Sequence, residues 1–431
     1  RYFSEYADAW SHAIGQVRLL ESDNLRQHAE TLADLASAQS PWVQLLHQLR
    51  ENTRLVAQRE HLEGVTRQVG ELGVAAQAGA ALLSGSALPG QMAPDSARRA
   101  LQRRFEPLHQ LLDAEQNPRE QLLQALRLLD EWQLQLAGLN RDDLPEQAAF
   151  RMASRRMDGQ QPQLGRLRDT AARLPQPLKG WFDSIADDSW RLLLDSAHAY
   201  VNQRYQSELY GFYAKTIQRR YPFTASARTD VALEDFQEFF KPRGSLARFY
   251  DSHLRAFVSA DGRRYRLRSL DGRSLPMSRS LLDQLSKAQM IRQGFFNDEQ
   301  EWAVRFSLAP YSLDPAVSRA MLSIGDKQLE YRHGPIVPMV FDWPGEADQS
   351  RTSLVLERGA QRPLGIKDNS GAWSLFRFVE LMQSELIDAR QARLFKADLS
   401  GLRAHFLLSS QRNPVPLQWE QWRTFRLPEQ L

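Results

Sequence analysis

The sequence contains no cysteine among its 431 residues, so disulfides, thiolate catalysis and cysteine-based zinc sites are excluded. It also lacks a marked excess of either charge. There are 55 Lys and Arg against 52 Asp and Glu, a formal net charge of +3, and the two signs are interspersed. A nucleic-acid-binding protein needs a concentrated basic face. We therefore expect no nucleic-acid partner.

Long hydrophobic runs are absent as well. About 20 consecutive apolar residues are needed to cross a bilayer, and the nearest stretch, Gly73 to Leu88, is rich in Ala and Gly and is interrupted by Gln77. The sequence begins without Met or a signal-like segment, so we expect a piece of a longer protein with any membrane anchor upstream. Hydrophobic residues make up 42% and charged residues 25%, which is typical of globular domains. This length predicts two to four domains.

Helical periodicity dominates from Arg1 to about Val258. Apolar residues recur at spacings of three and four between Leu122 and Leu136, which predicts an amphipathic helix that Asn117-Pro118 opens as cap and first turn. The same pattern predicts further helices over 10–20, 24–38, 41–69, 96–112 and 189–219. The segment 70–94 is low in large apolar residues and reads as a helix end followed by a loop.

The period changes near Phe257. Apolar residues then alternate with polar ones over short segments bounded by Gly, Asp and Pro, as in a β-sandwich. The strands are expected at 265–268, 304–308, 322–324, 329–331, 353–357, 392–396 and 403–409, with helices over 280–293 and 375–389. The sequence therefore predicts an α+β chain. A helical part, residues 1–257 with one or two subdomains, precedes a β-sandwich-like domain, residues 258–431, that carries an inserted helix.

Sequence motifs for catalysis or cofactor binding are missing. Gly85 and Gly90 have the spacing of a phosphate-binding loop, but Gln91 stands where Lys is required. The nine histidines form no H-E-x-x-H motif, and no G-x-S-x-G elbow occurs. The paired carboxylates Asp142-Asp143 and Asp187-Asp188 fall at helix boundaries, where they favour the helix dipole. We expect no enzyme activity, no cofactor and no metal.

Two kinds of residue in the β part have both a structural and a functional interpretation. His333, in Tyr331-Arg332-His333-Gly334-Pro335, could act as an acid or base, but a turn histidine bonded to a main-chain carbonyl is the favoured interpretation. Trp343 and Trp373 are expected to be core anchors at strand ends, although exposed aromatics can also be binding hot spots.

A set of short motifs follows in one order along the C-terminal half. These are Arg219-Arg220-Tyr221-Pro222-Phe223; Asp235 to Phe240 with Pro242-Arg243-Gly244; Gln293-Gly294-Phe295-Phe296; Tyr331 to Pro335; Trp343-Pro344-Gly345; Trp373 to Arg377; and Asn413-Pro414 with Phe425-Arg426-Leu427-Pro428. In these motifs the chain resembles the C-terminal, periplasmic region of the IcmF/TssM proteins, scaffold subunits of type VI secretion systems. The resemblance is strongest over residues 200–431.

The resemblance implies a non-catalytic periplasmic scaffold. Its helical part would rise from an inner-membrane anchor, and its β-domain would bind the outer-membrane lipoprotein TssJ. Several copies, with TssL at the inner membrane, would form an envelope-spanning complex.

Two other functions stay open at this point. One is a cell-wall hydrolase that uses carboxylates such as Glu357 and Asp368, and the other is a helical adaptor whose β-domain binds peptides by strand addition. The likeliest contact loops of the scaffold are 345–351 and 365–371, because loops on a rigid scaffold carry binding function. The candidate contact residues are Gly345, Asp348, Arg351, Gly365, Lys367, Asp368, Asn369 and Gly371.

Overall fold

The computed structural model describes residues 2–54, 95–262, 264–345, 351–368, 371–387, 392–410, 416–417 and 421–431. The segment 70–94, the second half of the helix expected over 41–69, the candidate residues Asp348 and Asn369, and the Asn413-Pro414 motif lie outside these ranges. The chain forms two compact units. Unit 1 is Arg1–Ala197 with Asp271–Arg273, and unit 2 is His198–Leu270 with Ser274–Leu431.

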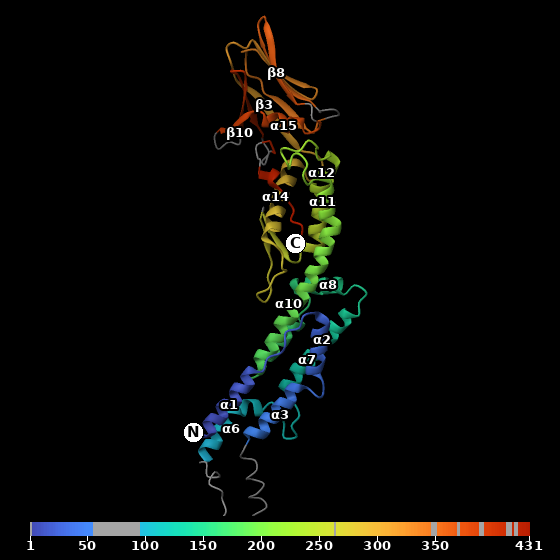
Figure 1. Ribbon diagram of the computed structural model, residues 1–431, viewed down its shortest axis with the longest axis vertical. Helices are drawn as coiled ribbons and strands as arrows, with labels where there is room; N and C mark the ends of the chain where they lie inside the picture. The colour runs from blue at the N-terminus through green and yellow to red at the C-terminus, as the bar shows by residue number, and fades with distance from the viewer. Residues whose placement is uncertain are drawn as a thin grey trace, which may run out of the picture. The chain divides into compact units, whose positions relative to one another are not determined.

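Unit 1 is helical (Figure 1). Among its described residues the helices are α1 (Tyr2–Gln16), α2 (Leu25–Ala36), α3 (Pro41–Thr53), α6 (Asp95–His109), α7 (Glu120–Asn140), α8 (Pro145–Met157), α9 (Gln163–Ala171) and most of α10 (Leu178–Arg204). Helix α2 packs along α7. The helix over 24–38 was placed well by the sequence, because the Asn24 side chain caps it by accepting from the Gln27 N–H at 2.9 Å.

The predicted start of α7 is wrong. The helix begins at Glu120 after Arg119, whose side chain makes no cap bond. Asn117 and Pro118 are used differently: Pro118 forms a bridge with Leu112, and the Asn117 carbonyl accepts from the Asp113 N–H at 2.9 Å. This turn fixes the two residues before the helix starts. The apolar face of α7 is as predicted, with Leu122, Leu126, Leu129, Trp132 and Leu136 buried.

A buried chain of polar groups crosses the core of unit 1. Trp132 donates to Ser189 Oγ at 2.9 Å, Ser189 lies 2.8 Å from His28 Nε2, and His28 Nδ1 lies 3.3 Å from Ser22 Oγ. An indole N–H can only donate, so the Ser189 oxygen accepts from Trp132 and its hydroxyl hydrogen remains available to His28 Nε2. Neutral His28 with its proton on Nδ1, toward Ser22, fits this arrangement. These hydrogen bonds connect α2, α7 and α10 through side chains in the core. Burial of His28, with Arg191 nearby, lowers its pKa to about 4.

Unit 2 opens with short helical elements. They are the end of α10, the π-helices η1 (Tyr205–Tyr210) and η2 (Tyr250–Leu254), α11 (Gly211–Thr216), α12 (Leu233–Phe240) and α13 (Ser245–Phe249). A hairpin of β1 (Val258–Asp261) and β2 (Arg264–Leu267) and the helix α14 (Arg279–Phe295) follow. The change from helix to strand therefore falls at Val258, as the period change predicted.

The rest of unit 2 is a β-sandwich with one five-stranded and one four-stranded sheet. The first has the order β6-β3-β11-β10-β9 and the second β5-β4-β7-β8, and the strand pairs within them are antiparallel. The strands are β3 (Val304–Leu313), β4 (Arg319–Ile324), β5 (Lys327–Tyr331), β6 (Met339–Trp343), β7 (Thr352–Arg358), β8 (Gln361–Asp368), β9 (Gln383–Ile387), β10 (Ala392–Leu399) and β11 (Leu402–Ser409).

Alternation explains why these segments are strands. Along β4 and β7 every second residue is buried, as the period-two pattern predicted. Phe306 of one sheet and Leu322 of the other line the same small void of about 20 Å³, so the two inner faces form one core. The helix α15 (Ser374–Glu380) packs against β7 and β8 at one end of the sandwich.

The inserted helix is real but shorter than predicted. It ends at Glu380, and residues 383–387 form the edge strand β9 instead of continuing the helix to 389. Register pairs Ser384 with Phe395 and Leu386 with Arg393, so main-chain bonds to β10 override the local helical pattern. Among the described residues, no helix is long and apolar enough to cross a membrane.

We predict that unit 1 loses stability in mild acid because of His28. Between pH 6.5 and about 4 its imidazole is protonated in the unfolded chain but not in the folded one, so stability is complete above pH 6.5 and falls as the pH drops toward 4. The loss at pH 4 is on the order of 3 kcal/mol, at ~1.4 kcal/mol per pKa unit. Denaturant unfolding of the chain between pH 4 and 8 measures it.

The control is His28→Gln, whose side-chain oxygen can still accept from Ser189 but does not titrate. In this variant the free energy of unfolding should fall less steeply between pH 6.5 and 4. The remaining fall comes in part from His109 and His253, whose pKa values burial also lowers. An unchanged fall in this variant would show that His28 is not the cause.

We also predict that residues 198–431 fold as a unit and that residues 258–431 do not. Phe236, Phe239 and Phe240 are completely buried, and a start at 258 removes all three from the core of unit 2. The shorter fragment should melt without cooperativity and bind a hydrophobic dye, whereas the longer one should give a sharp thermal transition. A cooperative melt of the shorter fragment at the same temperature would contradict this.

Candidate functional site

The structure brings no metal-binding cluster together in the parts of the chain that it describes: no three His, Asp or Glu there could hold an ion. The two residues considered for hydrolysis are also separated along the sheet. Register pairs Asp368 with Thr352 at the start of β7, whereas Glu357 lies five residues further along that strand, about 17 Å away at ~3.3 Å per residue. Glu357 is instead bound by Arg319 at 2.6 Å. A glycosidase pair needs carboxyl groups about 5–10 Å apart.

His333 has the structural role that its sequence context predicted. Its Nε2 lies 2.6 Å from the carbonyl oxygen of Val317, so the imidazole N–H donates to the main chain of the neighbouring connection. The residue itself is exposed rather than half-buried, and it adopts the left-handed backbone conformation with φ of +60°. His333 therefore ties together two turns.

The described candidate residues are spread over strand ends of the sandwich. The loop expected over 365–371 is partly wrong, because residues 365–368 form the end of β8. Arg351 precedes β7, and Lys367 pairs with Ser353 of that strand. The Arg351 carbonyl accepts from the Gly325 N–H at 3.0 Å. Gly345 follows β6 in the other sheet, and Gly365 lies within β8 opposite Val355.

Gly371 lies next to the helical portion of unit 2. A Cβ on Gly371 would come within 3.5 Å of Asp230 Oδ2, and the next residue, Ala372, accepts from the indole N–H of Trp343 at 3.0 Å. The sandwich therefore packs, in part, against the helical portion of the same unit. No distance or contact tests whether the candidate residues bind a partner, and they stay a prediction.

Several of the motifs along the C-terminal half meet in one aromatic cluster, which sequence reasoning did not foresee. Trp373 is fully buried, donates to the Val231 carbonyl at 2.8 Å and lies 4.8 Å from Trp343 and 5.2 Å from Phe236, centroid to centroid. Further members of the cluster are Phe223, Phe239, Phe240, Phe295, Phe296, Trp302, Phe376, Trp422 and Phe425. The expectation that Trp343 and Trp373 are core anchors is confirmed.

A set of charged groups surrounds Tyr221 at the border of this cluster. The Arg377 guanidinium lies 3.7 Å from the Tyr221 ring centroid and 2.5 Å from Asp230 Oδ1. The Tyr221 hydroxyl donates to Glu380 at 3.1 Å, and Arg423 pairs with the same carboxylate. The motif residues therefore satisfy one another and hold the fold. They do not form an open site.

A shallow pocket of about 780 Å³ lies on the outer face of the five-stranded sheet. Arg305 and Asp342, 3.5 Å apart, and Ser307 and Ser409, 2.8 Å apart, line it together with Trp302. The remaining polar side chains of the lining, Asn297 and Ser410, bond to Glu299 and to the Arg305 carbonyl.

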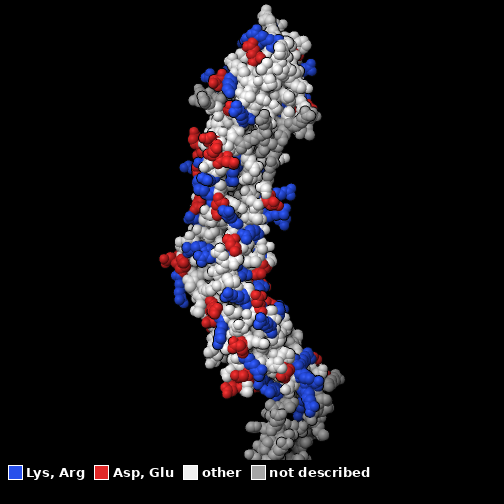
Figure 2. Space-filling view, turned by 180° about the vertical axis from the view of Figure 1, so that it is seen from behind, with Lys and Arg blue, Asp and Glu red and all other residues white. Residues whose placement is uncertain are grey.

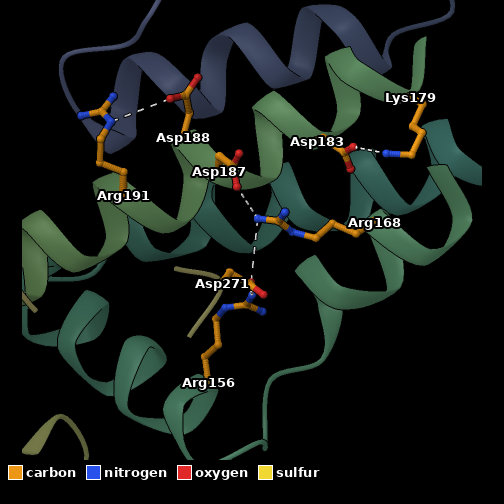
Figure 3. A network of polar contacts seen from close by, with 8 residues as sticks. All are labelled: Arg156, Arg168, Lys179, Asp183, Asp187, Asp188, Arg191 and Asp271. Atoms are coloured by element: carbon orange, nitrogen blue, oxygen red, sulfur yellow. Dashed lines mark hydrogen bonds and ion pairs between the residues drawn. The ribbon is translucent and has the colours of Figure 1, made fainter. Parts of the chain in front are cut away.

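A second polar network of unit 1, partly exposed, is made of charged side chains (Figure 3). Asp271 lies between Arg156, its ion-pair partner, and Arg168, whose Nη2 is 3.8 Å from it and 2.5 Å from Asp187. The Arg156 side chain is only 6% exposed, and its guanidinium lies 4.9 Å from the Trp190 ring centroid. The predicted helix boundary at Asp187 and Asp188 is wrong, because both residues lie inside α10. They are separate ion-pair partners of Arg168 and Arg191.

Three family models match the chain, in order. They are "Intracellular multiplication and human macrophage-killing" (IcmF-related) over residues 1–54, "Type VI secretion protein IcmF helical domain" over 196–300 and "Type VI secretion protein IcmF C2-like domain" over 306–412. A curated relative, "Type VI secretion system component TssM1" of Pseudomonas aeruginosa, is 24% identical over 452 residues, covering 100% of this chain. The chain belongs to the IcmF/TssM family. It spans 39% of the length of that relative.

Solved structures share the fold. One chain of a "Type VI secretion system membrane core complex" has a TM-score of 0.72 at 21% identity, covering 100% of this chain and 83% of its own length. A chain of a "Type VI membrane complex" gives 0.69 at 20% identity, with 100% and 84% covered. The "T6SS protein TssM C-terminal domain" from EAEC gives 0.50 at 20% identity, with 55% and 98% covered. The α+β organisation is thus that of the family.

We predict that Asp271→Asn destabilises unit 1 by about 2 kcal/mol, because it leaves the buried Arg156 without an ionised partner. Asn tolerates the left-handed backbone at this position, where φ is +50°, so the change acts on charge rather than on the main chain. The matched control is Asp8→Asn, which breaks the exposed pair with Arg104 and should cost under about 0.5 kcal/mol. Equal losses in denaturant titrations of the two variants would contradict the assigned role.

Proposed function

We propose that this chain is a non-catalytic structural part of a type VI secretion membrane complex, located in the periplasm. Its β-sandwich would bind an outer-membrane lipoprotein of the TssJ type, and its helical part would lead toward the inner membrane and TssL. The observation that carries the proposal is the family match, in which the models match residues 1–54, the helical segment 196–300 and most of the sandwich, 306–412, in order. Assembly of several copies into one complex is part of the proposal, supported by the complexes named in the related structures.

The chemistry of the chain supports a scaffold. The aromatic residues of most motifs in the C-terminal half are buried in a core, and the two residues considered for hydrolysis are separated along the sheet. Acidic and basic side chains are interspersed over the described surface in Figure 2, which shows no patch of one sign on that face. A nucleic-acid partner would need such a patch. A scaffold needs only rigid units and accessible surfaces.

The test is binding of the whole chain to the soluble domain of a TssJ-type lipoprotein, followed by a cross-linking map. We expect a one-to-one complex whose cross-links fall within residues 304–410, the sandwich. A standard interface of about 1,600 Å² needs several segments of each partner, so links from more than one connection are expected. Cross-links confined to unit 1 would contradict binding through the sandwich, and absence of binding would contradict the lipoprotein link.

A further inference from the structure

One end of the sandwich carries an exposed apolar segment that the fold does not need. We call this end, formed by the connections 314–318, 332–338, 359–360 and 400–401, the distal end. The structure describes every residue of these connections. The opposite end carries the loops 345–351 and 365–371 and the aromatic cluster. Along Gly334-Pro335-Ile336-Val337-Pro338 every residue is exposed, with Ile336 at 52% and Val337 at 67%.

Neighbouring apolar residues extend the surface. Tyr311, near the end of β3, is 52% exposed, and Val340 of β6 is 42% exposed. Strands β3 and β6 are paired as far as Leu308 and Met339. Tyr311 and Val340 therefore lie on the two strands next to the segment. Single exposed apolar residues are ordinary, whereas a run of consecutive exposed ones such as Pro335 to Pro338 indicates an interaction site.

The segment is held in place at both ends. Before it, Arg332 forms an ion pair with Glu330 of β5, and the ring of His333 donates to the Val317 carbonyl at 2.6 Å. After it, β6 pairs with β3 from Met339 onward. Pro335 and Pro338 restrict the backbone between these anchors. A preorganised segment loses little conformational entropy when a partner binds it.

The main chain of the segment indicates what kind of partner can cover it. Across the described residues, Gly334 to Pro338 make no main-chain hydrogen bond to another part of the chain. Burying the N–H groups of Ile336 and Val337 and the neighbouring carbonyls in lipid would leave them unsatisfied, at several kcal/mol per group. Another polypeptide can supply both an apolar pocket and the missing donors and acceptors.

The charge distribution also favours a protein partner over a lipid surface. The connections of the distal end contain no Lys and no Glu, and the Arg332 charge is compensated by Glu330. Cores of protein interfaces are depleted in Lys and Glu, whereas binding to an anionic membrane surface needs a local excess of Lys or Arg. The loops at the other end contain Glu346, Asp348, Arg351, Lys367 and Asp368.

We propose that Gly334–Pro338, with Tyr311 and Val340, is the surface through which the sandwich binds its folded protein partner. This rests on the proposed function, in which that partner is the outer-membrane lipoprotein. The partner presents an apolar groove with main-chain donors and acceptors along it, into which Ile336 and Val337 insert. The distal end, not the loops 345–351 and 365–371, then forms the centre of the interface.

The experiment compares matched variants of the whole chain. Ile336→Ser with Val337→Ser removes the two most exposed apolar side chains of the segment. Leu381→Ser with Leu386→Ser is the control, because these residues of the same domain are 61% and 63% exposed but lie outside the distal end. A third variant, Arg351→Ser with Lys367→Ser, removes two exposed charges of the other end and leaves the strand pairing in place. Thermal melts check that each variant is folded, and affinity for the soluble lipoprotein domain is the readout.

We expect the distal variant to weaken binding about 10- to 100-fold, as for the loss of central apolar contacts, and the other two variants to bind within about twofold of the parent. If the parent chain binds and the distal variant binds equally well, the surface is wrong while the proposed function stands. If the parent chain does not bind the lipoprotein, the proposed function itself fails.

Two further arms test the other occupants of the surface. Flotation with vesicles of phosphatidylethanolamine and phosphatidylglycerol measures lipid binding, and sedimentation of the chain alone measures self-association. Loss of either interaction in the distal variant, with lipoprotein binding unchanged, would assign the surface to lipid or to a second copy and overturn the proposal.

Discussion

Unit 2 depends above all on the burial of Trp373 between segments that are distant in sequence. Its ring contacts Phe236 from the helical part, Trp343 from the end of β6 and Phe376 from α15, and its N–H is satisfied by the Val231 carbonyl. Aromatic pairs of this kind contribute about 0.5–1.5 kcal/mol each beyond the area that they bury. A buried indole without an acceptor would cost a comparable amount. The cluster therefore fixes both the packing and the orientation of the segments that meet there.

This constraint explains why helical periodicity and domain structure do not divide the chain at the same residue. The period of the sequence changes near Phe257, but Phe236, Phe239 and Phe240 lie before that point and belong to the core of unit 2. Local pattern reports which secondary structure a segment forms. It carries no information on which core the segment joins, because that depends on contacts between residues far apart in sequence.

The same distinction separates what could be predicted about the elements from what could not. Strands such as β4 and β7, with one buried face, were placed closely by alternation. Strand β9 has no buried residue over Gln383–Leu386, so its sequence carries no alternation, and only its pairing with β10 makes it a strand. Asn117-Pro118 has the composition of a helix start, but Pro118 forms a β-bridge with Leu112 and the helix begins two residues later. The candidate contact loops were chosen for polarity and glycine, and this criterion also selected residues 365–368, which the pairing with β7 makes part of β8.

Tyr331-Arg332-His333-Gly334-Pro335 shows how a structural residue can serve a binding surface. His333 was weighed either as an acid or base or as a structural residue, and its bond to the Val317 carbonyl settles the local role. That bond also holds the start of the exposed run that follows. A flexible loop with Ile336 and Val337 at its tip would lose much of its binding free energy to ordering. A histidine fixed to the neighbouring turn and two prolines remove most of that cost in advance, so the rigidity of the fold is what makes the apolar segment usable as a contact surface.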